Sequence, residues 1–124
     1  EKARPSFRFE EAYEVFALLN HWIVGYGLPA KIRDKIAAAA GSFAPGDLSH
    51  RALQARGMRM TPSLHQEVDQ RRKRIIRQWA SFFERFDAVL MPCAPVAALA
   101  HDHEPNIMAR TLDIDGTAVP YLNF

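Results

Sequence analysis

Residues Trp79 to Pro95 read Trp-Ala-Ser-Phe-Phe-Glu-Arg-Phe-Asp-Ala-Val-Leu-Met-Pro-Cys-Ala-Pro, and within them a helical pattern gives way to an apolar run. The helical period continues to about Phe86 and is broken by Asp87, after which residues 88–91 show no polar alternation. A short run of this kind is typical of a strand buried on both faces. Two prolines then end the strand. The stretch therefore predicts a helix that leads through a buried strand, at about residues 88–91, into a site-forming loop.

The longest predicted helix lies directly upstream of this strand. Thr61 with Pro62 at the first helical position predicts its start, and a capping box of Ser63 and Gln66 is the alternative. Apolar and aromatic residues three or four apart form a stripe along it, and we expect the helix to run to about Phe86. The stripe contains Val68, Arg72, Ile75, Trp79, Phe82 and Phe86, and is widened by Ile76 and Phe83.

The first 60 residues also show helical patterns, so helices are expected over about residues 6–86. Ser6 is a candidate cap for the first helix, and Pro29 lies where a second helix begins. A short third helix is predicted between Asp47, as its cap, and Gly57, as its end. The predicted buried face of the first helix consists of Phe9, Ala12, Tyr13, Phe16, Leu19 and Ile23.

The C-terminal part predicts a β-hairpin at about residues 111–119. Alternating apolar residues flank Asp115-Gly116, a pair that can adopt the positive φ angles of a type I′ turn. One buried strand and one hairpin make a poor sheet alone, so these strands are expected to join a larger one. The expected fold class is a mainly α fragment with one buried-type strand and a short hairpin. We find no linker, and we expect residues 1–124 to form a single fragment.

The composition bounds the class of protein. A length of 124 residues suits one domain or part of a larger one, and 48% hydrophobic with 24% charged residues excludes a disordered chain. A formal net charge of +2 is too small to indicate a nucleic-acid partner, and no apolar run is long enough to cross a membrane. The single cysteine, Cys93, is typical of a reducing compartment and therefore favours a cytoplasmic protein.

Several groups of residues could carry chemistry, and each also has an ordinary structural interpretation. His101-Asp102-His103-Glu104 has the composition of a metal site but no specific spacing, so a polar loop is favoured. Arg71–Arg74 could contact phosphates, but a helix points these four side chains in different directions. Cys93 could be a nucleophile only with a base from His65 or from the 101–103 loop, and a small buried thiol is favoured.

No nucleophile or base of a known motif is present in the chain. The serines lie at helix starts, in loops or within a helix, and none is part of a Gly-x-Ser-x-Gly elbow or a Gly-Ser-rich loop. The four lysines all lie in segments expected to be exposed, whereas a catalytic lysine base needs desolvation to lower its pKa. The sequence therefore predicts no catalytic, cofactor-binding or metal-binding residue.

The second half of the chain nevertheless resembles the C-terminal third of enzymes of the amidase signature family. The family commonly shows a helix, an aspartate opening a hydrophobic strand, a Pro-x-x-Pro loop and a hairpin around a Val- or Ile-Asp-Gly turn. The resemblance covers about Thr61 to Phe124 well and the earlier helices only loosely. It rests on Phe82–Pro95, His101–His103, Arg110–Leu112, Asp113–Gly116 and Pro120–Phe124, in that order.

This resemblance implies the larger α/β amidase signature fold and hydrolysis of carboxamide C–N bonds without a cofactor. The family uses a serine nucleophile, a second serine and a lysine, all upstream of the part represented here, so the chain alone is expected to be inactive. The implied partners are the remainder of the amidase domain and a small amide substrate, with neither nucleic acid nor membrane, and the fragment is expected to self-associate. The implied substrate-pocket wall is Pro92, Cys93, Ala94, Pro95, Tyr121 and Phe124.

Two departures from the family pattern stand out. A threonine is frequent where Cys93 stands, and the chain stops at Phe124, before the Gly-Pro-rich strand that follows in the family. The second departure is interpreted as truncation. The alternative from another class is a self-contained helical interaction module, in which the stripe from Trp79 to Phe86 packs against a partner helix and no enzyme is involved.

Overall fold

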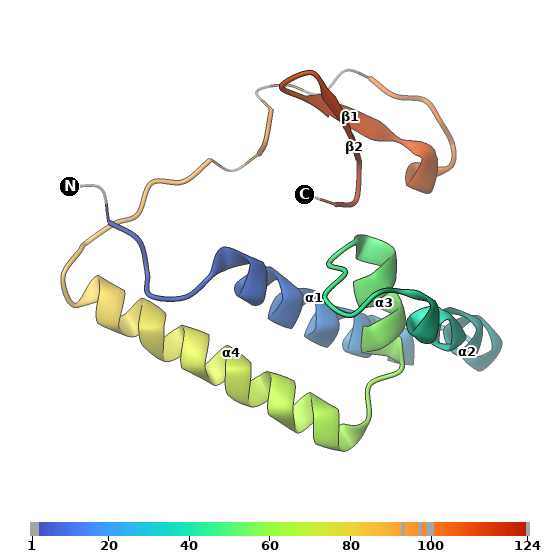
Figure 1. Cartoon of the computed structure of the whole chain (residues 1–124), viewed down its shortest axis with the longest axis horizontal. Coiled ribbons are helices and arrows are strands. Elements are labelled where there is room, and N and C mark those ends of the chain that lie inside the picture. The colour runs from blue at the N-terminus through green and yellow to red at the C-terminus, as the bar shows by residue number, and fades with distance from the viewer. Residues whose placement is uncertain (1–2, 93, 97, 99–100, 124) are drawn as a thin grey trace. The chain divides into compact units, whose positions relative to one another are not determined.

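The computed structural model describes residues 3–92, 94–96, 98 and 101–123. This part of the chain is mainly helical with a small two-stranded antiparallel sheet, which confirms the mainly α fold class with a short hairpin (Figure 1). The chain divides into two compact units, residues 1–88 and 89–124. The sequence had shown no linker at this boundary, which falls inside the run that predicted a buried strand.

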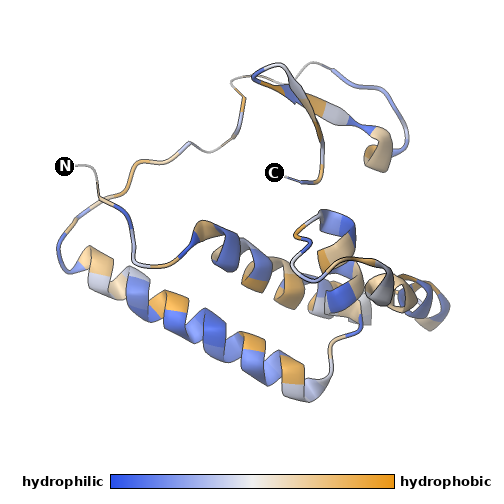
Figure 2. Cartoon of the chain, viewed as in Figure 1, coloured by the Kyte–Doolittle hydropathy of each residue, from blue (hydrophilic) through white to orange (hydrophobic). Residues whose placement is uncertain are grey.

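The first unit consists of helices α1 (Phe9–Tyr26), α2 (Ala30–Ala38), α3 (His50–Met58) and α4 (Pro62–Phe83), with a short 3₁₀ helix, η1 (Ala39–Ser42). α1 and α4 run side by side in opposite directions, and α1 also packs on α3 (Figure 1). Figure 2 shows the apolar residues of α4 recurring between hydrophilic ones, as the sequence pattern predicts. None of the described helices combines the length and the apolar character needed to cross a membrane.

The predicted start of α4 is confirmed, whereas two other predicted caps are wrong. The hydroxyl of Thr61 accepts a hydrogen bond from the backbone N–H of Leu64 at 3.2 Å. α1 begins after Arg8 without any side-chain cap, so Ser6 has no capping role. α3 is capped by Ser49, whose hydroxyl accepts from Ala52, while Asp47 accepts from the N–H of Ser49 at 2.8 Å and so shapes the turn before the helix.

The buried face of α1 coincides only in part with the predicted one, because Ala12, Tyr13 and Leu19 pack half-buried against the core. Phe16 and Ile23 are each 64% exposed, whereas Val15 and Leu18 are buried against α3 and α4. Leu18 is two positions from Phe16, which is about 200° around a helix. α1 carries apolar residues on both sides, so its periodicity alone could not decide which side these neighbours cover.

The stripe of α4 is narrower and shorter than predicted. Val68, Ile75 and Phe82 are buried, but Ile76 and Phe83 are exposed. The helix ends at Phe83 rather than near residue 86. The aromatic end of the stripe packs within the unit, with Phe7 and Trp79 edge to face at 5.3 Å between ring centroids.

The predicted strand at residues 88–91 does not form. These residues are neither strand nor helix and are exposed, with Leu90 99% exposed. An isolated extended segment has no partner for its backbone N–H and C=O groups. Among the described residues the two strands form only the hairpin, so nothing pairs with this segment.

The hairpin forms as predicted. β1 (Thr111–Ile114) pairs antiparallel with β2 (Thr117–Pro120), and Leu112 lies opposite Val119. Asp115 and Gly116 have φ angles of 51° and 80°, as a type I′ turn requires. The 3₁₀ helix η2 (Ile107–Ala109) precedes β1.

Gly57 lies inside α3, not at its end as predicted, and it permits the close approach of α3 to α1. A Cβ atom there would lie 2.7 Å from Cβ of His21 and 2.8 Å from the carbonyl oxygen of Leu18. Backbone atoms of a packed helix cannot move aside without shifting the helix. The absence of a side chain at Gly57 is therefore a condition for this packing.

We expect Gly57→Ala to destabilise the helical unit by about 1–3 kcal/mol, because the added methyl group overpacks the contact between α1 and α3. Gly41→Ala is the matched control, since a Cβ there meets nothing within 4 Å and Gly41 has no positive φ. Its effect should stay within about 0.5 kcal/mol. Urea denaturation followed by far-UV circular dichroism measures both, and equal effects would contradict the packing argument.

Candidate functional site

A pocket of about 710 Å³ lies in the second unit, beside the hairpin. Its lining brings together residues of the 96–103 segment, of β1 with the residue before it, and of the turn after β2. They are Val96, Ala98, His101, Asp102, His103, Arg110, Thr111, Leu112, Asp113 and Tyr121.

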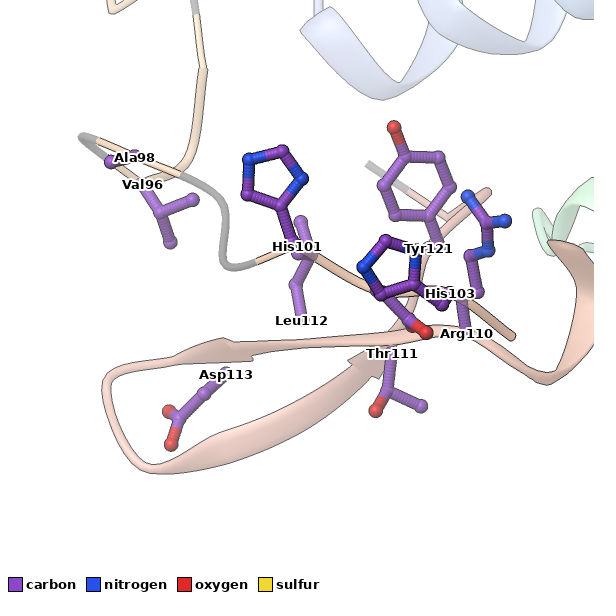
Figure 3. Close-up of a pocket in the computed structure, with 10 residues that line it drawn as sticks. Val96, Ala98, His101, His103, Arg110, Thr111, Leu112, Asp113 and Tyr121 are labelled. Carbon is purple, nitrogen blue, oxygen red and sulfur yellow. The ribbon is translucent and has the colours of Figure 1, made fainter. Parts of the chain in front are cut away.

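The alternation of β1 sorts these side chains onto two sides. Arg110 and Leu112 lie on the side where Tyr121, His101 and His103 gather, whereas Thr111 and Asp113 point the opposite way (Figure 3). Alternate residues of a strand face opposite sides of a sheet, so Arg110 and Leu112 share a side because they are two apart.

Hydrogen bonds between residues close in sequence shape the segment that leads into β1. The carboxylate of Asp102 accepts from the N–H of Glu104 at 2.8 Å, and the carboxylate of Glu104 accepts from the N–H of Asn106 at 2.9 Å. The guanidinium of Arg110 donates through Nε to the carbonyl of Glu104 at 2.8 Å. The acidic side chains of residues 102 and 104 thus each accept a hydrogen bond from the backbone N–H two residues further on, which at Asp102 is the pattern of an Asx turn.

A metal site has no support in this geometry. The rings of His101 and His103 are nearly parallel, with centroids 6.1 Å apart. Within the described residues, no three histidine, cysteine, aspartate or glutamate side chains are grouped so that they could hold a metal ion. The arrangement fits the polar loop that the sequence favoured.

The residues of the implied pocket wall have different outcomes. Tyr121 lines the pocket and is half-buried. Pro92, Ala94 and Pro95 are exposed and are not among the described lining residues, because no buried strand forms to hold this loop in place. Cys93 and Phe124 lie outside the described residues. The wall itself, which belongs to a whole amidase domain, stays a prediction.

The basic run Arg71–Arg74 is dispersed, as the helical pattern predicts. Arg71 forms ion pairs with Glu11 and Glu14 of α1, and Arg74 also pairs with Glu11. Arg72 and Lys73 both pair with Asp69 of the same helix. Their hydrogen bonds, with that of Lys73 the larger cause, hold the pKa of the Asp69 carboxyl below its usual value. These side chains join α4 to α1 and to itself, so they do not form a phosphate-binding patch.

The helical unit holds a second group of titratable residues that the sequence did not reveal. His21 is 8% exposed, its ring meets that of His50 edge to face at 4.9 Å, and its Nδ1 lacks a hydrogen-bond partner among the described atoms. Nothing in the sequence pattern indicated this, because the two residues lie on different helices. His65, a suggested base for Cys93, instead packs on Trp22 at 4.0 Å between centroids.

An apolar groove lies between α1 and α4, with a volume of about 320 Å³. Phe16 and Ile23 of α1 and Ile76 of α4 line it and are exposed. The apolar spacing predicted that these three side chains are buried, whereas all three are exposed. Within the helical unit, no other described element fills this groove between α1 and α4.

Comparison of the chain with protein-family models, with curated proteins and with solved structures finds no match. The relationship to the amidase signature family therefore rests on the residues that carry the resemblance and remains a proposal.

The pair His21–His50 predicts a dependence of stability on pH. Burial is the main cause that lowers the pKa of both imidazoles. The nearby His50 lowers the pKa of His21 further, and the charge of Arg51 lowers the pKa of His50 further. An unfolded histidine titrates near pH 6.5. Below that pH the unfolded chain binds more protons than the folded one, so the contribution to stability is complete above about pH 6.5 and is lost as the pH falls toward the lowered pKa values.

We expect the free energy of unfolding, measured by urea denaturation from about pH 7.5 to pH 5, to decrease across this range. His21→Gln should reduce that slope, because the buried group no longer titrates. His101→Gln, outside the helical unit, is the control and should leave the slope unchanged. An identical slope in wild type and His21→Gln would contradict the assignment.

Proposed function

We propose that this chain is the C-terminal structural part of an amidase domain that hydrolyses carboxamide C–N bonds by a serine–serine–lysine mechanism. The reactive residues would lie outside the chain, which alone would be inactive. In this proposal the two units belong to the larger α/β amidase fold and act as a frame. The resemblance from Thr61 onward supports the family.

The observation that carries the proposal is the apolar surface that each unit, taken by itself, leaves exposed. α1 is apolar on two sides, and the groove formed by Phe16, Ile23 and Ile76 is open. A surface helix normally buries its apolar stripe against a core, so a second apolar side on α1 indicates a further neighbour. Contiguous exposed apolar surface of this kind marks an interface with other protein.

The segment at residues 88–91 supports the same conclusion. Val89, Leu90 and Met91 are all exposed, although their sequence has the composition of a strand buried on both faces. In the proposed domain this segment pairs with strands of the remaining sheet, and the hairpin joins the same sheet. Its backbone groups and apolar side chains would then both be satisfied.

The remaining parts of the proposal follow from the family. The substrate is a small amide, no cofactor is needed, and the polypeptide that completes the domain is the main partner. Pro92–Pro95, Tyr121 and Phe124 form one wall of the substrate pocket. The single cysteine supports a cytoplasmic location. Neither nucleic acid nor membrane is a partner.

The alternative of a helical interaction module receives less support from the proposed contact stripe. Phe82 is buried and Phe7 packs on Trp79, so much of the stripe is already covered within the unit. Only Phe83 of the stripe's aromatic end is strongly exposed. A partner helix would have to displace these contacts.

The gene sequence upstream of the Glu1 codon and an activity assay test the proposal together. We expect the upstream frame to encode a Gly-Ser-rich loop and a lysine, and we expect the purified chain to release no ammonia from benzamide. The polypeptide that includes the upstream part should hydrolyse an amide and lose this activity when that lysine is replaced by alanine. A frame that begins near Glu1, or hydrolysis by the chain alone, would overturn the proposal.

The uncovered groove also predicts self-association of the purified chain. Ile76→Ser removes an apolar side chain from the groove, while Ile32→Ser is matched to it, because the two residues are 51% and 49% exposed and Ile32 lies on α2. We expect sedimentation velocity to show association that increases with concentration, and Ile76→Ser to weaken it and to lower the binding of an apolar dye. A monomer at every concentration without dye binding, or equal effects of the two variants, would contradict this.

A further inference from the structure

One face of the hairpin unit gathers nitrogen donors that have no assigned role. Arg110 extends from the residue just before β1, and His101 and His103 extend from the preceding segment to the same side (Figure 3). Leu112 lies beside them and adds an apolar surface. A few donors above an apolar wall is the usual composition of a site for a small organic ligand.

Arg110 is held in place at both its backbone and its side chain. Its carbonyl accepts from the N–H of Tyr121 at 2.9 Å, and its Nε donates to the carbonyl of Glu104 at 2.8 Å. The side chain is therefore fixed through one nitrogen of the guanidinium, while the group as a whole has five N–H donors. Among the described residues no carboxylate lies within ion-pair distance of it, in contrast to Arg71, which pairs with two.

The carboxylates that line the same pocket are engaged elsewhere. Asp113 points away from Arg110, and its Oδ1 accepts from the N–H of Gly116 at 2.7 Å (Figure 3). Asp102 accepts from the N–H of Glu104. The guanidinium of Arg110 therefore supplies a single full positive charge on this face, which suits a ligand with one negative charge better than a dianion such as phosphate.

We propose that this face binds a small organic carboxylate with an apolar body. The guanidinium of Arg110 holds the carboxylate, the imidazoles of His101 and His103 donate further hydrogen bonds, and Leu112 contacts the apolar part. Arginine suits this role because its planar fork matches the two oxygens of a carboxylate. If the proposed function holds, the ligand is the carboxylate group of an amide substrate. This identification of the ligand rests on the proposed function, whereas the carboxylate site itself does not.

Titration of the whole purified chain with benzoate, followed by NMR of the imidazole C–H and arginine Nε–Hε signals, tests the proposal. Benzamide is the matched probe, because it has the same ring and is itself an amide but carries no charge. We expect saturable shifts at His101, His103 and Arg110 with benzoate, and at least tenfold weaker binding of benzamide. Equal binding of the two, no saturable shift, or tighter binding of inorganic phosphate would overturn the proposal.

Substitution of Arg110 supplies an independent comparison. Arg110→Gln should weaken benzoate binding at least tenfold, whereas Arg77→Gln, which removes the same charge from the exposed side of α4, should leave it unchanged. The amide shifts of Leu112 and Val119 report whether the hairpin remains folded in Arg110→Gln. Unchanged benzoate binding in Arg110→Gln, or the same loss in both variants, would contradict the role of Arg110.

These measurements need no catalysis, so their outcome is separate from that of the amidase proposal. Benzoate binding by a chain whose gene lacks an upstream Gly-Ser-rich loop and lysine would support the carboxylate site and overturn the enzyme. The converse result would support the enzyme and reject the site. Each proposal can therefore fail without the other.

Discussion

The helical unit depends on the close contact between α1 and α3 at Gly57. A side chain there would collide with the carbonyl of Leu18 and with His21, so only a glycine lets the two helices approach this closely. The approach buries Leu53 completely and places Leu18 in the same core cluster. It also places His21 against His50, which is why two imidazoles with lowered pKa values lie together. His21 is buried and His50 is half-buried.

The position of α1 between α3 and α4 leaves one of its apolar sides uncovered within the helical unit. Val15 and Leu18 face the core, and Phe16 and Ile23 face the groove with Ile76 of α4. The ion pairs of Arg71 with Glu11 and Glu14 join α1 to α4. The unit thus resembles a layer of a larger core more than a closed module. This property connects the fold to the proposed place of the chain in an amidase domain.

Local sequence signals predicted several elements well because each depends on residues close together in the chain. Thr61-Pro62 determines the start of α4 through a cap and a fixed φ angle, and Asp115-Gly116 determines the hairpin turn through positive φ. Arg110, the residue before β1, shares a side with Leu112 by the same alternation, although no sequence motif marks it as a binding residue. The pocket itself needed the tertiary structure, because His101 and His103 reach it from a segment without a regular period.

The sequence by itself determined the helical class, the start of α4, the hairpin and the separation of the basic residues at 71–74. Only the tertiary structure decided which side of α1 is buried, that residues 88–91 have no strand to pair with, and that His21 meets His50. The physical reason is that periodicity shows which faces are apolar, whereas burial requires a partner surface. A strand likewise needs a neighbour for its hydrogen bonds, and no residue within the run from Ala88 to Met91 can supply one.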